Sequence, residues 1–266
     1  MNLKYLLNKT VLITGASSGI GFELAKIFAS CGAKLIVVAR SQEGLTKAAG
    51  ALKAQYPDLN ITAFAADLSL PDAADGLLAR LDSAGIESDI LVNDAGFGDG
   101  RDFIETPLET LTAMVNTNVV NLTVLTHRIL GQMLKKGEGK ILNLASTGSF
   151  IPGPHLAVYC ATKAYVLKLS QALHFELRNT PVTVTALCPG ATDTNFARRA
   201  GMEDTWLFTK YVMQPDQVAL IGFRALMKGR RQVTAGFFNQ LQTFMLRFSP
   251  VPLTLKLADL ILKHRP

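Results

Sequence analysis

The chain is poor in cysteine and has no metal-like motif. Its three cysteines, Cys31, Cys160 and Cys188, are odd in number and far apart. This argues against a disulfide framework or a zinc ribbon and favours a reducing compartment, so we expect a cytoplasmic protein. The histidines show no metal-like spacing among themselves or with the cysteines, which predicts no metal site.

Long apolar runs and dense charge are also lacking. No stretch approaches the roughly 20 apolar residues that are needed to cross a bilayer, and residues 1–10 show no apolar segment of signal-peptide length. Charged residues are 18% of the chain against 48% hydrophobic residues, which is the opposite of the balance in disordered chains. The net charge is +6, but the chain has no basic run longer than pairs such as Arg198-Arg199. We therefore expect no nucleic acid partner.

Short β-branched runs alternate with longer segments of helical period. Strands are predicted at residues 11–14, 34–39, 61–65, 89–92, 140–144, 182–187 and 232–234, with helices between them, among them 20–30, 108–135 and 155–178. Near-continuous apolar strands that alternate with helices are typical of a parallel sheet covered on both faces. Right-handed crossovers then predict a doubly wound α/β fold. We find no repeat and no linker, so we expect one domain over residues 1–236, extended by residues 237–266.

The last thirty residues differ from the rest. Pro250 and Pro252 divide residues 237–266 into two amphipathic helical pieces. One interpretation is that both pieces pack on the body or on a partner subunit. The other is a substrate lid or a contact with a membrane surface, because basic residues flank the apolar ones: Arg247, Lys256, Lys263, His264 and Arg265.

A glycine-rich turn joins the first strand to the first helix. Gly15 permits a tight turn, Gly19 allows close approach of a ligand, and Gly21 lets the helix press on the sheet. Backbone N–H groups at a helix N-terminus attract an anion, most naturally a pyrophosphate.

Arg40 and Ser41 follow the second strand, where NAD-binding folds usually place an acid. A guanidinium suits a 2′-phosphate, so we expect NADP(H) rather than NAD(H).

Tyr159 and Lys163 are one helical turn apart and share a face. An ammonium near a phenol favours the phenolate, so Lys163 is expected to lower the pKa of Tyr159 and to make it an acid or base near neutral pH. Ser146 follows the fifth strand and could donate a hydrogen bond to a carbonyl. Asn118 stands inside the long predicted helix, where asparagine is otherwise a poor choice.

With these motifs the chain resembles the short-chain dehydrogenase/reductase family over about residues 9–236. TGxxxGxG appears at residues 14–21 and YxxxK at residues 159–163, and Ser146 has the family's spacing of thirteen residues before the tyrosine, which Ser149 lacks. The resemblance implies a Rossmann sheet of seven strands, with Asn118, Ser146, Tyr159 and Lys163 as the catalytic residues. It implies cofactor contacts from Gly15, Ser17, Ser18, Gly19, Ile20, Arg40, Ser41, Asp67, Leu68, Asn93, Ala95, Gly96, Tyr159, Lys163, Pro189, Gly190, Thr192 and Thr194.

Two positions depart from the family pattern. The Asn-Asn-Ala-Gly segment is Asn93-Asp94-Ala95-Gly96 here, so Asp94 can accept hydrogen bonds but cannot donate as an amide does. The usual Ser-Ser pair is Ala145-Ser146, which keeps the matching serine.

The resemblance implies hydride transfer between NADP(H) and a small-molecule carbonyl or secondary alcohol, in a homodimer or homotetramer. Two alternatives stay open: a cofactor-binding sensor or scaffold without turnover, and a reductase of lipid or acyl ketones at a membrane surface. Trp206, with Met202, Leu207 and Phe208, is either an apolar lid or ordinary packing.

Overall fold

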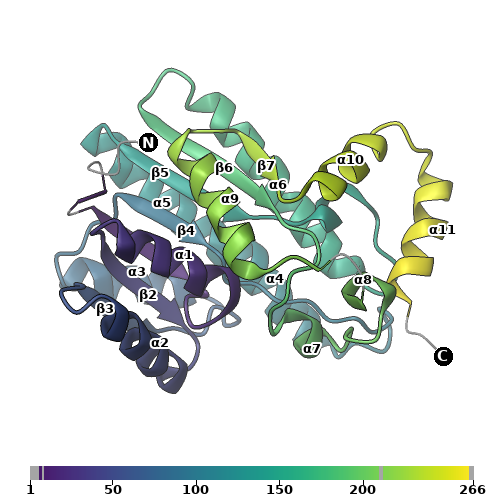
Figure 1. Ribbon diagram of the computed structural model, residues 1–266, viewed down its shortest axis with the longest axis horizontal. Coiled ribbons are helices and arrows are strands. Elements are labelled where there is room, and N and C mark those ends of the chain that lie inside the picture. The colour runs from purple at the N-terminus through teal and green to yellow at the C-terminus, as the bar shows by residue number, and fades with distance from the viewer. Residues whose placement is uncertain (1–5, 8, 210–211, 264–266) are drawn as a thin grey trace.

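A seven-stranded parallel sheet forms the centre of the protein (Figure 1). The computed structural model describes residues 6–7, 9–209 and 212–263. The strand order is β3-β2-β1-β4-β5-β6-β7, and every pair is parallel. The strands are β1 (Thr10–Thr14), β2 (Lys34–Ala39), β3 (Ile61–Ala65), β4 (Ile90–Asn93), β5 (Gly139–Leu144), β6 (Val182–Cys188) and β7 (Gln232–Thr234). The predicted doubly wound fold is confirmed, with strand ends within one residue of the predicted ones.

Helices cover both faces of the sheet because alternate strand residues point to opposite sides. Val11 and Ile13 of β1 are buried with α1 (Gly19–Ser30), α2 (Gln42–Gln55) and α9 (Pro215–Met227). Leu12, between them, is buried on the other face with α3 (Ala73–Ser83), α5 (Asn121–Lys136) and the end of α6 (Ala157–Glu176). Burial on both faces explains why the strands read as continuous apolar runs.

The predicted long helix over 108–135 is interrupted. It consists of α4 (Leu108–Val115), a π-helical turn η2 (Asn116–Val120) and α5. The Asn116 amide donates to Ser69 O, and the Asn121 amide donates to Leu68 O and Leu70 O. These side chains bind the loop after β3 instead of facing solvent, which is why asparagines stand at this point of the helix. A π-turn of this kind is common at functional sites.

The C-terminal segment forms two helices, as predicted from its prolines. These are α10 (Phe237–Met245) and α11 (Val251–Leu262), and Pro250 and Pro252 lie at the start of α11. In Figure 1 they are the yellow helices at the edge of the molecule. There α10 contacts β7 and the 3-10 turn η3 (Thr147–Phe150), and α11 contacts α8 (Trp206–Thr209). His264 and Arg265, part of the predicted basic end, lie outside the described residues.

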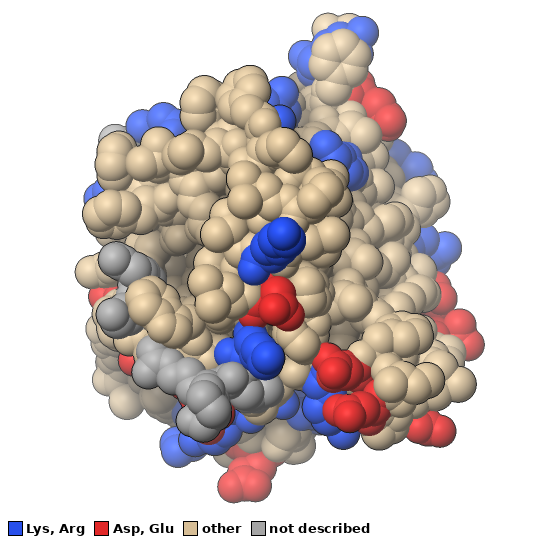
Figure 2. Space-filling view, turned by 90° about the vertical axis from the view of Figure 1, so that its right-hand side faces the viewer, with Lys and Arg blue, Asp and Glu red and all other residues tan. Residues whose placement is uncertain are grey.

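Both helices nevertheless leave many apolar side chains exposed. Phe237 and Phe244 of α10, Leu260 of α11 and Phe248 between the helices are each more than half exposed. The face turned toward the viewer in Figure 2 is uncharged over most of its area, and charged residues of both signs adjoin one another in its lower part. Within the described ranges, every helix is too short or too polar to span a bilayer.

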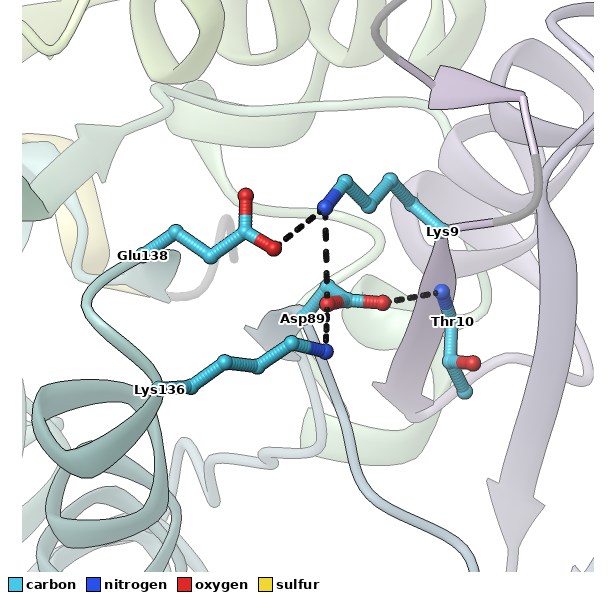
Figure 3. A network of polar contacts seen from close by, with 5 residues as sticks. All are labelled: Lys9, Thr10, Asp89, Lys136 and Glu138. Carbon is cyan, nitrogen blue, oxygen red and sulfur yellow. Dashed lines mark hydrogen bonds and ion pairs between the residues drawn. The ribbon is translucent and has the colours of Figure 1, made fainter.

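An ion-pair network joins the amino ends of β1, β4 and β5 (Figure 3). Asp89 accepts from Lys136 Nζ at 2.5 Å and from the Thr10 N–H at 2.8 Å. Lys9 Nζ lies 3.7 Å from Asp89 and 2.5 Å from Glu138. Burial alone would raise the pKa of Asp89, but the bonds from Lys136 and Thr10 and the charge of Lys9 outweigh it, so the pKa is lowered. The network therefore stabilises the end of the sheet away from the glycine loop.

Replacing Asp89 by Asn should lower the free energy of unfolding by about 1–3 kcal/mol at neutral pH, because Lys136 loses its buried ionic partner. A group with a lowered pKa stabilises the fold above its unfolded pKa of about 4, and this contribution is lost as pH falls through the folded pKa. Urea denaturation of wild type and D89N at pH 7 and about pH 3 measures both effects. D82N, at an exposed position of α3, is the control and should stay within about 0.5 kcal/mol. Equal losses at both pH values would contradict this account.

Candidate active site

A cavity of about 1060 Å³ opens at the carboxyl ends of the strands, the edge at which ligands bind in doubly wound sheets. It brings together almost all residues that the sequence singles out. Of the predicted cofactor contacts, all except Asn93 line it. Of the predicted catalytic residues, Ser146, Tyr159 and Lys163 line it and Asn118 lies behind its wall.

The glycine loop forms one wall of this cavity. Gly15 and Gly19 have φ values of +73° and +62°, in the left-handed region that favours glycine. A Cβ on Gly21 would lie 2.5 Å from Asp94 Oδ2, so only glycine lets α1 approach β4 this closely. Ser18, the N-cap of α1, makes no side-chain cap bond. A helix N-terminus left uncapped at the cavity fits an anionic group such as a pyrophosphate.

Arg40 and Ser41 lie where β2 meets the cavity. Arg40 is exposed and makes no hydrogen bond or ion pair with any residue that the structure describes. Ser41 caps α2, because its Oγ accepts from the Gly44 N–H at 3.2 Å, and its hydroxyl proton is still able to donate. Further along, Asp67 accepts from the backbone and hydroxyl of Ser69, which fixes its carboxylate at the cavity wall. The Arg40 guanidinium and the Ser41 hydroxyl are groups that can donate to a phosphate.

Tyr159 and Ser146 both line the cavity, and the Ser146 hydroxyl is close enough to Tyr159 to oppose the rise of its pKa. Ser146 Oγ also accepts from the Gly148 N–H at 3.0 Å. The rival serine, Ser149, donates to the Lys163 carbonyl at 2.8 Å and lies outside the cavity lining. The choice of Ser146 by spacing thus agrees with the geometry.

Lys163 is buried behind Tyr159. Its Nζ donates to Leu144 O at 2.8 Å and lies 5.8 Å from the centre of the Tyr159 ring. Burial lowers the pKa of Lys163 to about 8, although the Asp94 carboxylate opposes this. Burial also raises the pKa of Tyr159 well above its usual value. The predicted lowering of the Tyr159 pKa is therefore not found in this structure, because burial of the phenol outweighs the effect of the Ser146 hydroxyl.

Asn118 holds the wall next to Lys163. Its amide donates to Phe97 O at 3.0 Å and to Thr162 Oγ1 at 3.0 Å, and its carbonyl accepts from the Phe97 N–H at 3.2 Å. A Cβ on Gly96 would lie 3.1 Å from both Asn118 Oδ1 and Lys163 Nζ. Asn118 therefore fixes the loop after β4 against α6, directly beside the lysine.

Asn93 lies outside the cavity lining, so its role in cofactor binding stays a prediction. Its amide donates to Thr126 Oγ1 at 3.0 Å and to Asn143 Oδ1 at 2.9 Å, and the Asn143 amide donates to Ser170 Oγ. The last residue of a strand alternates in direction like any other, and here the side chain points into the helix layer. Asn93 thus links β4 to α5 and β5.

Asp94 takes the place that the family pattern gives to a second asparagine. Its carboxylate accepts from the Gly21 N–H and interacts with Lys163. Burial raises the pKa of Asp94 to about 7, although Lys163 and Gly21 oppose this. Near neutral pH the protonated fraction can donate as an amide would, so the concern about the lost donor applies to the ionised form alone.

The far end of the cavity is apolar and includes both segments that the sequence indicates as possible lids. Phe196 lies 5.1 Å from the Tyr159 ring and Phe208 lies 6.1 Å from Phe196, measured between ring centres. Beyond them, α10 and α11 line the cavity. The tail therefore packs on the body and also forms a wall of the site. Trp206 and Leu207 line the cavity too, whereas Met202 is fully buried.

His155 connects the tail to the body. Its two ring nitrogens bind Asp102 at 2.6 Å and Asp259 at 2.9 Å. Burial alone would lower the pKa of His155, but the two carboxylates outweigh it and raise the pKa. The sequence gives no signal for this contact, because Asp259 follows His155 by about a hundred residues.

The comparison with known families agrees with this geometry. The family described as short chain dehydrogenase matches residues 9–204. The chain belongs to the short-chain dehydrogenase family. Members of this family are oxidoreductases that use NAD(P)(H).

Several members are similar over most of this short-chain dehydrogenase. A very-long-chain 3-oxoacyl-CoA reductase of Rattus norvegicus is 32% identical over 196 residues, which cover 72% of this chain and 62% of that enzyme. A solved short-chain dehydrogenase from Sphingobium yanoikuyae, in complex with NADPH, is 31% identical with a TM-score of 0.79, and the match covers 90% of this chain and 94% of that one. A bulky-bulky ketone specific alcohol dehydrogenase from Comamonas testosteroni is 27% identical with a TM-score of 0.75, covering 90% and 93%.

Replacing Asp94 by Asn should lower the pKa of Lys163 below its value of about 8, by on the order of one pH unit. The reason is that the carboxylate opposes the effect of burial on the ammonium. An NMR titration of the lysine side chains measures it, with Lys163→Gln to assign the signal. Asp67→Asn, at another wall of the cavity, should leave the titration unchanged. A Lys163 pKa that is the same in D94N and wild type would show that the two groups are not coupled.

Proposed function

We propose that this short-chain dehydrogenase interconverts a carbonyl compound and a secondary alcohol with NADP(H), using Ser146, Tyr159, Lys163 and Asn118. The observation that carries the proposal is that the hydroxyls of Ser146 and Tyr159 line one cavity beside the buried Lys163, together with the glycine loop. A proton donor and an oxygen-binding group at one point of a water-poor site are what carbonyl reduction requires.

Each residue has a separate role in the proposed reaction. The dinucleotide, when bound, supplies or accepts the hydride. Tyr159, which burial keeps protonated at neutral pH, donates its proton to the developing alkoxide, and Ser146 donates a hydrogen bond to the same oxygen. Lys163 keeps positive charge behind the phenol and so favours departure of its proton. Asn118 acts as a positioning residue, because it fixes the loop at Phe97 beside Lys163.

Arg40 supports NADP(H) rather than NAD(H). Its guanidinium is exposed at the cavity edge next to the Ser41 hydroxyl, and charge-assisted bonds to a phosphate suit both groups. The relative from Sphingobium yanoikuyae was solved with NADPH, and the relatives from Rattus norvegicus and Comamonas testosteroni are named for 3-oxoacyl-CoA reduction and for ketones. Carbonyl reduction with NADPH agrees with these relatives.

A cofactor-binding scaffold without turnover is disfavoured by the completeness of the site. Ser146, Tyr159 and Lys163 all line the cavity, whereas a scaffold needs only the glycine loop and its flanks. Exposed apolar side chains on α4 and α6, among them Leu108 and Phe175, support the homodimer or homotetramer that the resemblance implies.

Replacing Tyr159 by Phe should reduce NADPH-dependent turnover of ketones by about 10²–10⁴-fold, because the proton donor is lost. The dissociation constant for NADPH should change by no more than about threefold, since the ring and its packing remain. Absorbance of NADPH with a panel of ketones and titration calorimetry provide the two measurements. Tyr165→Phe, on the same helix with its hydroxyl bonded to Thr123, is the matched control. Full turnover by Y159F would overturn the assignment.

Replacing Arg40 by Ala should weaken NADPH binding by about tenfold to a hundredfold and leave NADH binding within about threefold, because only NADPH carries the 2′-phosphate. Titration calorimetry with both cofactors measures this. Lys47→Ala, at an exposed position of α2 outside the cavity lining, controls for a general loss of positive charge. Equal or tighter binding of NADH by the wild type would refute the role of Arg40. Binding of neither cofactor would refute the proposed function itself.

A further inference from the structure

The cavity continues past Tyr159 between the two C-terminal helices. Leu241 and Met245 line it from α10, and Leu257 and Ile261 line it from α11. Residues four apart share one face of a helix. Each of the two helices therefore presents an apolar face to the cavity, and the path from Tyr159 to these faces runs along Phe196 and Phe208.

Three polar side chains in this part of the wall bond to nearby backbone carbonyls, and the exposed amide of Gln242 is a further polar group of the lining. The Thr254 hydroxyl donates to Pro250 O, the Ser249 hydroxyl to Met245 O, and the Asn239 amide to Ala235 O. Their donors are thereby occupied. A ligand rich in hydroxyl groups would lose its bonds to water here and gain few in return.

Charge is also scarce at this end. Among the lining residues described between positions 195 and 262, Arg199 is the charged one, and it is exposed at the rim. Acidic side chains are absent from the same part of the lining. Burial of CH₂ groups is the main favourable interaction that such a wall offers.

The size of the cavity leaves room for a long ligand. Small-molecule sites commonly measure about 300–1,000 Å³, and this cavity, at about 1060 Å³, reaches from Arg40 at one end to Ile261 at the other. A dinucleotide would occupy the glycine-loop end. The end formed by α10 and α11 remains for the substrate.

We propose, on the basis of the function proposed above, that the substrate is a carbonyl compound with a long apolar chain of the fatty-acyl type. Its carbonyl lies at Tyr159 and Ser146, and its chain lies between α10 and α11. Reduction forms a C–H bond from the hydride of NADPH and an O–H bond from the proton of Tyr159 while the π bond of the carbonyl breaks. NADP⁺ and a secondary alcohol result, and solvent returns the proton to Tyr159.

The first test is a chain-length series. Straight-chain methyl ketones from butanone to dodecanone, with fructose as a polar comparison, are reduced with NADPH by the full-length protein. Each added CH₂ group should raise kcat/KM by about twofold to fourfold until the cavity is filled. Fructose should be reduced more slowly than the long ketones.

Inward and outward residues of the same helices provide matched variants. Leu241→Gln and Ile261→Gln alter the lining, and Phe244→Gln and Leu260→Gln alter apolar residues that do not line the cavity and are largely exposed. The inward variants should lower the ratio of kcat/KM for dodecanone to that for butanone by about tenfold. The outward variants should leave this ratio unchanged.

A binding measurement separates the proposed substrate class from the proposed reductase activity. Trp206 is the only tryptophan of the chain and lines the cavity, so its fluorescence reports on ligands without turnover. Dodecanone should shift the emission to the blue, and Leu241→Gln should weaken that binding. Turnover that is independent of chain length, with no fluorescence response, would overturn the substrate class and leave the reductase intact. Fluorescence binding of dodecanone without turnover of any ketone would overturn the reductase and keep an apolar-chain site.

Discussion

The burial of a parallel sheet on both faces is the constraint from which the site follows. All seven strands run in one direction, so all of their carboxyl ends lie at one edge, and helices must cover both faces because each strand is apolar on both sides. The loops after β1, β2, β4 and β5 therefore converge on the same cavity. At the opposite edge, Asp89 connects three strands to Lys136, Thr10 and Lys9. One edge is fixed by ion pairs, and the other is left free for binding.

Within the site, the neighbouring groups compensate the burial of one ammonium, that of Lys163. Lys163 is 5% exposed, and an ammonium with so little water is unfavourable unless hydrogen bonds and an opposite charge compensate. Leu144 supplies a carbonyl and Asp94 supplies the charge. The absence of a side chain at Gly96 leaves the space that Lys163 Nζ and Asn118 occupy. Asp94, which stands where the family pattern has an asparagine, thus carries the charge that opposes that of Lys163 in this wall.

The strands could be predicted closely from the sequence because burial on both faces leaves a strong local pattern, as in residues 34–39. The glycine loop, Ser146, Tyr159 and Lys163 were likewise predictable, because a fixed spacing on one strand end or helix brings each into place. Three features were not. The π-turn at Asn116 depends on bonds to the loop after β3, the direction of Asn93 depends on its neighbours in space, and the pKa of Tyr159 depends on burial. Each of these is set by tertiary contacts that no local pattern records.

The two ends of the cavity come from different parts of the chain. The groups that perform the proposed chemistry lie on η2, on α6 and directly after β5, whereas the apolar end includes α8, α10 and α11 at the edge of the molecule. Of these outer helices, α10 contacts the sheet at its edge strand β7, and α11 contacts α8. Substrate preference and catalysis are for this reason separable in evolution: a descendant of this protein could acquire a new range of substrates through a few changes in its last thirty residues, with no compensating change in the core.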